Sequence, residues 1–180
     1  GSTDGAADAS PPTPQVLPAQ GIGASELGVI VNSDDPQSVD VGAYYVQKRG
    51  IPAANVITLS LGASFATNLT RKVSSATFAG WKSQLDANTP ANVQAYAVTF
   101  IYPSVVDCMS LTSAIAFGFD AKYCSTPCNT TAASPWYGST SSAPFAKHAM
   151  RPAMVIASKT AAGAKTLVDR GVSSDLTFPL

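Results

Sequence analysis

The stretch from Leu27 to Leu61, LGVIVNSDDPQSVDVGAYYVQKRGIPAANVITLSL, decides the fold of this chain. It begins with a short apolar, β-branched run of the kind found in strands that are buried on both faces. Asp34 or Asp35 can then cap a helix in which Pro36 is the first residue, and a glycine ends that helix. Val56–Leu61 is a second apolar run. The stretch therefore predicts a strand, a helix and a strand, the unit from which parallel α/β sheets are built.

The rest of the chain continues the alternation of strands and helices. Ser75 is the predicted cap of a second helix, whose large apolar residues recur at spacings of three and four. The other predicted elements are a third strand at Val93–Tyr102, a helix at Met109–Phe117, a long excursion at Cys124–Pro144, a fourth strand at Met154–Ser158 and a helix at Thr160–Arg170 that Gly171 closes. We expect an α/β fold with a doubly wound, mainly parallel sheet of at least four strands flanked by helices.

We expect residues 23–180 to form this single domain and residues 1–22 to be an extended arm rich in Pro and Ala. The arm has Pro at positions 11, 12, 14 and 18 and almost no large apolar residue. Such a segment cannot bury enough surface to offset the entropy of ordering. It is compatible with a tether left after removal of a signal peptide, with a lipid anchor on a Cys before residue 1, or with an arm that docks on a neighbouring subunit. Gly1 and Ser2 are equally compatible with a cloning scar.

Charge is sparse along the whole chain. Asp, Glu, Lys and Arg make up 12% of the residues, and the net charge is zero. This is about half the charged share usual in soluble proteins. Without a basic cluster the chain lacks the field that nucleic acid or an anionic membrane requires, and no apolar run approaches the roughly 20 residues of a transmembrane span. A weakly charged surface instead favours protein partners or self-association.

The three cysteines, Cys108, Cys124 and Cys128, are an odd number. In an exported protein this predicts one disulfide and one further thiol, and the sequence does not choose the pair. Cys108 is also a weak candidate for a catalytic nucleophile. The single histidine, His148, precedes the fourth predicted strand and so belongs to the opposite edge of the sheet. The cysteine and histidine spacings match no familiar zinc site, and a glycine-rich phosphate loop is missing, so we expect no metal and no cofactor.

In doubly wound sheets, ligands bind outside the carboxyl ends of the strands. Amide and carboxylate groups at this edge can orient a polar substrate or a hard cation. A turn followed by a helix cap explains the first of these residues equally well, and we prefer that interpretation. The candidate ligand-binding residues at this edge are Asn32, Asp34, Asp35, Asp107 and Lys159, with Ser104 as a second weak candidate nucleophile; Ser33, Ser158 and Thr160 share the edge.

Three segments together resemble one known group of proteins. They are VIVNSDDPQSVDVGAYYVQKRGIPAANVI, then VTFIYP followed by CMSLTSAIAFGFD, and RPAMVIASKTAAGAKTLVDRGVSSD. They resemble an uncharacterised family of exported bacterial proteins found in genomes that carry the exosortase sorting system. The resemblance implies export to the periplasm, the cell surface or the extracellular space. It also implies a chain that usually continues past the equivalent of Leu180, and it assigns no catalytic residue.

Two hypotheses for function follow. The first is an exported surface or envelope protein that acts by association, as a subunit of an extracellular assembly. Its basis is the low charge, the odd cysteine and the Pro-rich arm. The alternative is a peptidase-like hydrolase on a caspase- or gingipain-type α/β sheet, in which Cys108 or Ser104 would be the nucleophile at the carboxyl ends of the strands. The sequence does not decide whether the protein is an enzyme.

Overall fold

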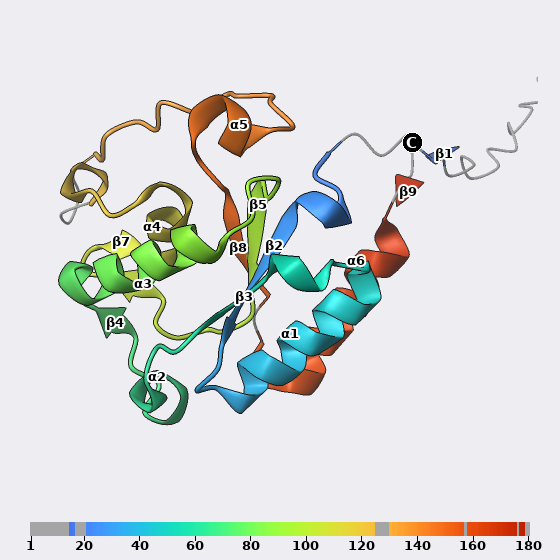
Figure 1. Cartoon of the computed structure of the whole chain (residues 1–180), viewed down its shortest axis with the longest axis horizontal. Coiled ribbons are helices and arrows are strands. Elements are labelled where there is room, and N and C mark those ends of the chain that lie inside the picture. The colour runs from blue at the N-terminus through green and yellow to red at the C-terminus, as the bar shows by residue number, and fades with distance from the viewer. Residues whose placement is uncertain (1–14, 17–20, 125–129, 157, 176, 179–180) are drawn as a thin grey trace, which may run out of the picture.

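The computed structural model describes residues 15–16, 21–124, 130–156, 158–175 and 177–178 of the chain. At its centre is a four-stranded sheet with the order β3-β2-β5-β8, in which every neighbouring pair is parallel (Figure 1). The strands are β2 (Leu27–Asn32), β3 (Val56–Leu59), β5 (Ala95–Val98) and β8 (Ala153–Val155). The α/β fold that the sequence predicts, with a mainly parallel sheet flanked by helices, is confirmed.

Helices lie on both faces of this sheet (Figure 1). One side carries α1 (Pro36–Arg49) and α6 (Ala161–Ser174), and the other carries α3 (Ser75–Asn88) and α4 (Leu111–Phe117). The short helical elements are η1 (Ala24–Glu26), η2 (Ala53–Asn55), α2 (Ala63–Thr67), η3 (Ala121–Tyr123) and α5 (Pro144–His148). Among the described residues, no helix has both the length and the apolar character needed to cross a bilayer.

Two smaller sheets accompany the central one. The first joins β4 (Lys72–Val73), β6 (Val105–Val106) and β7 (Met109–Ser110), and the second pairs β1 (Gln15–Val16) with β9 (Thr177–Phe178) in antiparallel fashion. Two residues of the N-terminal arm therefore pair with the C-terminal segment of the same chain. This contact differs from the docking on a neighbouring subunit that the sequence left open.

Local signals set both ends of α1, as the sequence predicts. Asp35 has extended backbone angles, and its side chain accepts a hydrogen bond of 2.9 Å from the backbone N–H of Gln37, so it is the cap. Gly50 ends the helix with φ of 63°, a conformation that costs glycine little. Between these ends, a Cβ on Gly42 would lie only 2.8 Å from Val31 Cγ2. Helix α1 therefore rests directly on β2.

Several polar contacts join α1 to α6. The Tyr44 hydroxyl donates to both carboxylate oxygens of Asp169, at 2.7 and 2.9 Å, and Lys165 Nζ lies 2.7 Å from Asp40 Oδ1. A Cβ on Gly171 would lie 3.0 Å from Arg49 Nη2. Helix α6 continues through Gly171 to Ser174, so the prediction that Gly171 ends the helix is wrong.

Other boundaries also differ from the sequence predictions. Helix α3 is capped by Ser74, whose hydroxyl accepts from Thr77 N at 3.1 Å, and not by Ser75, because either serine can serve as a cap. Met109 and Ser110 pair with β6 as a strand instead of opening a helix. The third and fourth predicted strands are shorter in the structure, where they are β5 and β8.

The main core fills the space between the sheet and the helices α3 and α4. A smaller cluster of Val29, Val31 and Ile51 lies on the α1 face. The main cluster includes the buried side chains of Ile30, Ile57, Leu59, Phe78, Leu85, Tyr96, Val98, Phe100, Leu111 and Ile115. The residues of β2 face both cores in alternation, which explains why that strand is apolar along its whole length.

Candidate functional site

At the carboxyl end of β2, a closed hydrogen-bond network surrounds Asn32, which is fully buried. Its Oδ1 accepts from the backbone N–H of Asp34 at 3.1 Å and of Leu61 at 3.3 Å. Its own backbone N–H donates to Ser38 Oγ at 2.9 Å, and that hydroxyl lies 2.7 Å from Thr99 Oγ1. The Asn32 Nδ2 atom is buried and has no hydrogen-bond partner among the described residues. The network joins β2, α1 and the segments that follow β3 and β5.

The acidic residues after β2 are also committed to local structure. Asp34 Oδ2 accepts from Ser60 Oγ at 2.8 Å and from Gly62 N at 2.7 Å. These hydrogen bonds, with that of Ser60 as the largest effect, lower the pKa of Asp34. Asp35 caps α1. Both contacts support the capping interpretation, since each carboxylate already stabilises a loop or a helix end.

The structure does not bring Asp107 to this group. Asp107 lies in the turn between β6 and β7 with φ of 49°. Its Oδ2 accepts from Ser75 N at 2.9 Å, and Lys72 Nζ is 3.8 Å from its Oδ1. The hydrogen bonds from Ser75 lower the pKa of Asp107 most. Ser104 directly precedes β6 of the smaller sheet, and its backbone N–H donates to Arg71 O at 2.9 Å.

The remaining predicted residues are spread along the chain. Cys108 is joined to Cys124 in a disulfide, so its sulfur is not a thiolate nucleophile in this oxidised protein. Cys128 lies outside the described residues. Lys159 is exposed, and the carbonyl of Ser158 accepts from Gln37 Nε2 at 3.0 Å. Within the described ranges, no three His, Cys, Asp or Glu side chains gather as a metal site would require.

Sequence reasoning missed a contact between Ser139 Oγ and His148 Nε2, which are 2.9 Å apart. A serine beside a histidine is half of a nucleophilic set, because the histidine can take the hydroxyl proton. In the described part of the chain, however, no carboxylate is bonded to the other ring nitrogen of His148. Ser139 is exposed to solvent. The pair alone does not form a catalytic group.

A pocket lies at the opposite edge of the sheet, where β5 and β8 begin. Its volume is about 360 Å³, and its lining includes Tyr96, Phe145 and Arg151. Arg151 is only 7% exposed, which is unusual for a charged side chain. The rule for doubly wound sheets directs attention to the carboxyl edge and so overlooks this pocket. The only sequence signal is a single arginine directly before a short apolar strand.

The two edges of the sheet therefore differ in character. At the carboxyl edge, the predicted residues Asn32, Asp34 and Asp35 form hydrogen bonds that hold neighbouring loops and the start of α1. The amino edge is hollowed and holds a buried cation. No protein-family model, curated protein or solved structure matches this chain.

Proposed function

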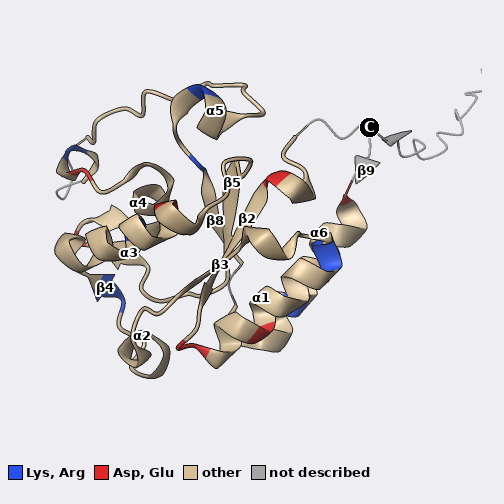
Figure 2. Ribbon diagram, in the orientation of Figure 1, with Lys and Arg blue, Asp and Glu red and all other residues tan. Residues whose placement is uncertain are grey.

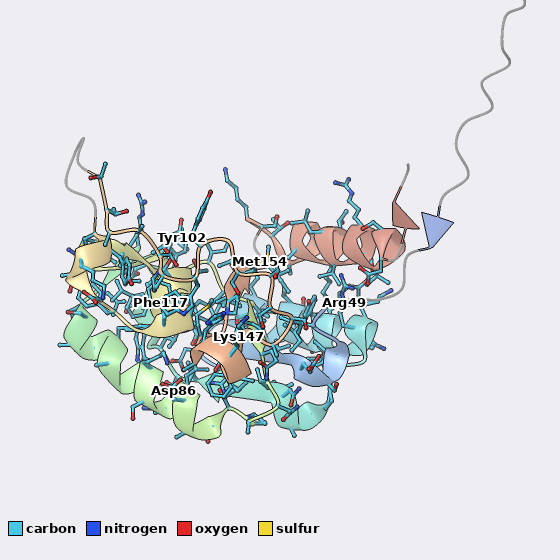
Figure 3. The ribbon with its side chains drawn as sticks, turned by 90° about the horizontal axis from the view of Figure 1, so that it is seen from above. Arg49, Asp86, Tyr102, Phe117, Lys147 and Met154 are labelled. Atoms are coloured by element: carbon cyan, nitrogen blue, oxygen red, sulfur yellow. A yellow bond between two sulfur atoms is a disulfide. The ribbon has the colours of Figure 1, made fainter. Side chains whose placement is uncertain are left out.

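We propose that this protein acts by self-association, with copies pairing through the free edge of β8. The observation that carries the proposal is the exposure of Met154. Across the sheet, Val29, Ala97 and Met154 are aligned in register on one face. Val29 is 0% exposed and Ala97 4%, whereas Met154 is 77% exposed. Figure 3 labels Met154 between the two helical layers. A large apolar side chain in the central sheet is thus left uncovered.

The backbone of β8 is also open on one side. Pro152 O accepts from Tyr96 N at 2.8 Å, and Ile156 N donates to Val98 O at 2.8 Å. Peptide groups point alternately to the two sides of a strand. The N–H and C=O groups of Ala153 and Val155 therefore point away from β5. They are available to another strand, because β8 is the last strand of the sheet.

Strand β8 has no charged side chain that would oppose pairing with another strand. Natural edge strands are commonly guarded by lysine, proline or an inward-pointing charge. Strand β8 has the sequence Ala-Met-Val and carries no charged side chain (Figure 2). At the other end of the sheet, β3 exposes the polar Thr58 instead. Strand β8 is therefore the edge that favours pairing.

The partner in this proposal is a second copy of the chain. Two β8 strands can pair antiparallel about a two-fold axis, so that the same residues are used twice and the two sheets become continuous. A stable dimer buries about 800 Å² on each partner, more than a three-residue strand supplies. We therefore expect weak, concentration-dependent formation of dimers.

Export is the second part of the proposal. The Cys108–Cys124 disulfide supports it, because such bonds persist in oxidising compartments outside the cytoplasm. The resemblance to exported bacterial proteins supports the same location. The hydrolase alternative gains no support, because no contact among the described residues joins Ser104 to a base and Cys108 is already bonded.

Analytical ultracentrifugation of the whole chain over micromolar to millimolar concentrations tests the proposal. We expect the average mass to rise with concentration for the wild type and to stay at the monomer value for Met154→Lys, since a charge on the edge opposes pairing. Thr58→Lys, the matched change on the other edge strand, should associate like the wild type. A wild type that stays monomeric throughout, or equal effects of the two substitutions, would refute pairing through β8.

A further inference from the structure

The pocket at the amino edge of the sheet is built from several elements. It lies among α3, α4, α5 and the beginnings of β5 and β8. Helix α5 is held there by Gln94, whose Oε1 accepts from the backbone N–H groups of Phe145 at 3.1 Å and Ala146 at 3.2 Å. A volume of about 360 Å³ lies within the range of small-molecule sites.

Arg151 is the one strongly buried charge that lines this pocket. Its Nε donates to the carbonyl of Val93 at 2.8 Å. Among the described residues no carboxylate lies within ion-pair distance of Arg151. The Tyr96 hydroxyl also interacts with the guanidinium, but a neutral phenol does not balance its charge. Burying a cation without a paired anion costs desolvation free energy. A ligand anion bound beside the guanidinium would offset that desolvation.

The other charges of the lining already compensate each other. Lys82 Nζ lies 2.6 Å from Asp86 Oδ1 on the same helix. The pocket therefore carries one uncompensated positive charge, that of Arg151. One anionic group with a single charge would balance it, whereas a phosphate dianion would leave an excess of negative charge beside Asp86.

The walls next to Arg151 are aromatic and aliphatic. The centre of the guanidinium lies 3.2 Å from the centroid of the Phe145 ring, and it lies 5.9 Å from that of Tyr96. The Tyr96 hydroxyl is directed to Thr89 Oγ1, 2.8 Å away. The stacked ring holds the guanidinium in one plane, which prepares its fork for a planar carboxylate. The alanine and isoleucine side chains of the lining suit an apolar body attached to that carboxylate.

We propose that this pocket binds a small organic monocarboxylate, with its carboxylate on the Arg151 guanidinium and its apolar body against Phe145 and the aliphatic wall. The pocket lies at the amino end of β8, whereas the proposed pairing uses the outer edge of that strand. The protein would then bind a small ligand as well as associate with itself.

Titration of the ¹⁵N-labelled chain followed by NMR tests this site. The probes are sodium benzoate, benzamide as its uncharged counterpart, and inorganic phosphate, all at constant ionic strength. We expect benzoate to shift the amide signals of Ala116, Phe145 and Ala149 in a saturable manner. Benzamide should bind at least tenfold more weakly, because it cannot pair with Arg151. Phosphate should not saturate these shifts.

Variants distinguish binding of benzoate in this pocket from non-specific attraction of anions to positive charges. Ala91→Trp places a large ring at an exposed position of the lining and should abolish benzoate binding without removing any charge. Arg151→Lys should weaken it at least fivefold, since lysine lacks the planar fork. Arg71→Gln, at an exposed arginine elsewhere, should leave it unchanged.

Four results would overturn the proposal: no saturable shift with benzoate, equal binding of benzamide, saturation by phosphate, or benzoate binding that survives Ala91→Trp. The last variant keeps the test decisive even if substitution of Arg151 prevents folding.

Discussion

Removal of the Cys108–Cys124 disulfide should destabilise the protein by about 3 kcal/mol. The bond links two residues that are 16 positions apart. Closing a loop of this length in the unfolded chain costs about 10 cal/mol/K, which is about 3 kcal/mol at 25 °C. The bond joins the β6–β7 hairpin to the segment after η3, and Cys124 packs against the main core. The loss is a large fraction of the total stability of a domain.

Urea unfolding followed by circular dichroism measures this loss. We expect the double variant Cys108→Ala/Cys124→Ala to unfold at a midpoint about 1.5 M lower, for a slope of about 2 kcal/mol/M. Its melting temperature should fall by about 6–12 °C. The wild type with reductant should behave like the double variant, whereas Cys128→Ser should unfold like the oxidised wild type and keep its response to reductant.

Two results would refute this reasoning. One is a double variant as stable as the oxidised wild type, because loop closure would then contribute nothing. The other is a peptide map in which Cys128 takes part in the bridge, since the closed loop would have a different length.

Three further predictions follow from individual contacts. Gly42→Ala should destabilise the protein by about 1–3 kcal/mol, because the new methyl group would clash with Val31, and urea unfolding measures the loss. Gly80→Ala, in a helix where nothing lies within 4 Å, should instead stabilise it by about 0.5–1 kcal/mol. The lowered pKa of Asp34 contributes stability that is fully present above the unfolded value of 3.8 and is lost as the pH falls through the lower folded value. Asp34→Asn should therefore lose less stability than the wild type between pH 6 and pH 3, and equal losses in parallel urea titrations would contradict this.

The fold class could be predicted from sequence because its signals are local. Asp35, Pro36 and Gly50 each act on backbone groups within one turn of the end of α1 that they define. Both ends of this helix therefore lie where the sequence predicts. The end of α6 could not be predicted in the same way. Gly171 is a normal stop signal, but α6 continues through it to Ser174, alongside α1, which lies more than a hundred positions earlier in the chain.

The candidate site was predicted less well for a related reason. The carboxyl-edge rule identified Asn32 and Asp34, which the structure does bring together with Leu61. It also selected Asp107, because the third strand was expected to run to Tyr102. The strand ends at Val98, and the chain then enters a different sheet.

The amino-acid sequence by itself determined the order of the four strands of the central sheet and of the four helices that flank it, the caps of the first helix and the low charge of the chain. These depend on the chemistry of neighbouring residues. Only the tertiary structure decided that Cys108 pairs with Cys124, that Met154 is uncovered at the sheet edge and that Arg151 is buried beside Phe145 without an acid. Each of these depends on which distant segments the packed sheet places side by side, because burial and pairing are properties of the folded neighbourhood and not of the residue type.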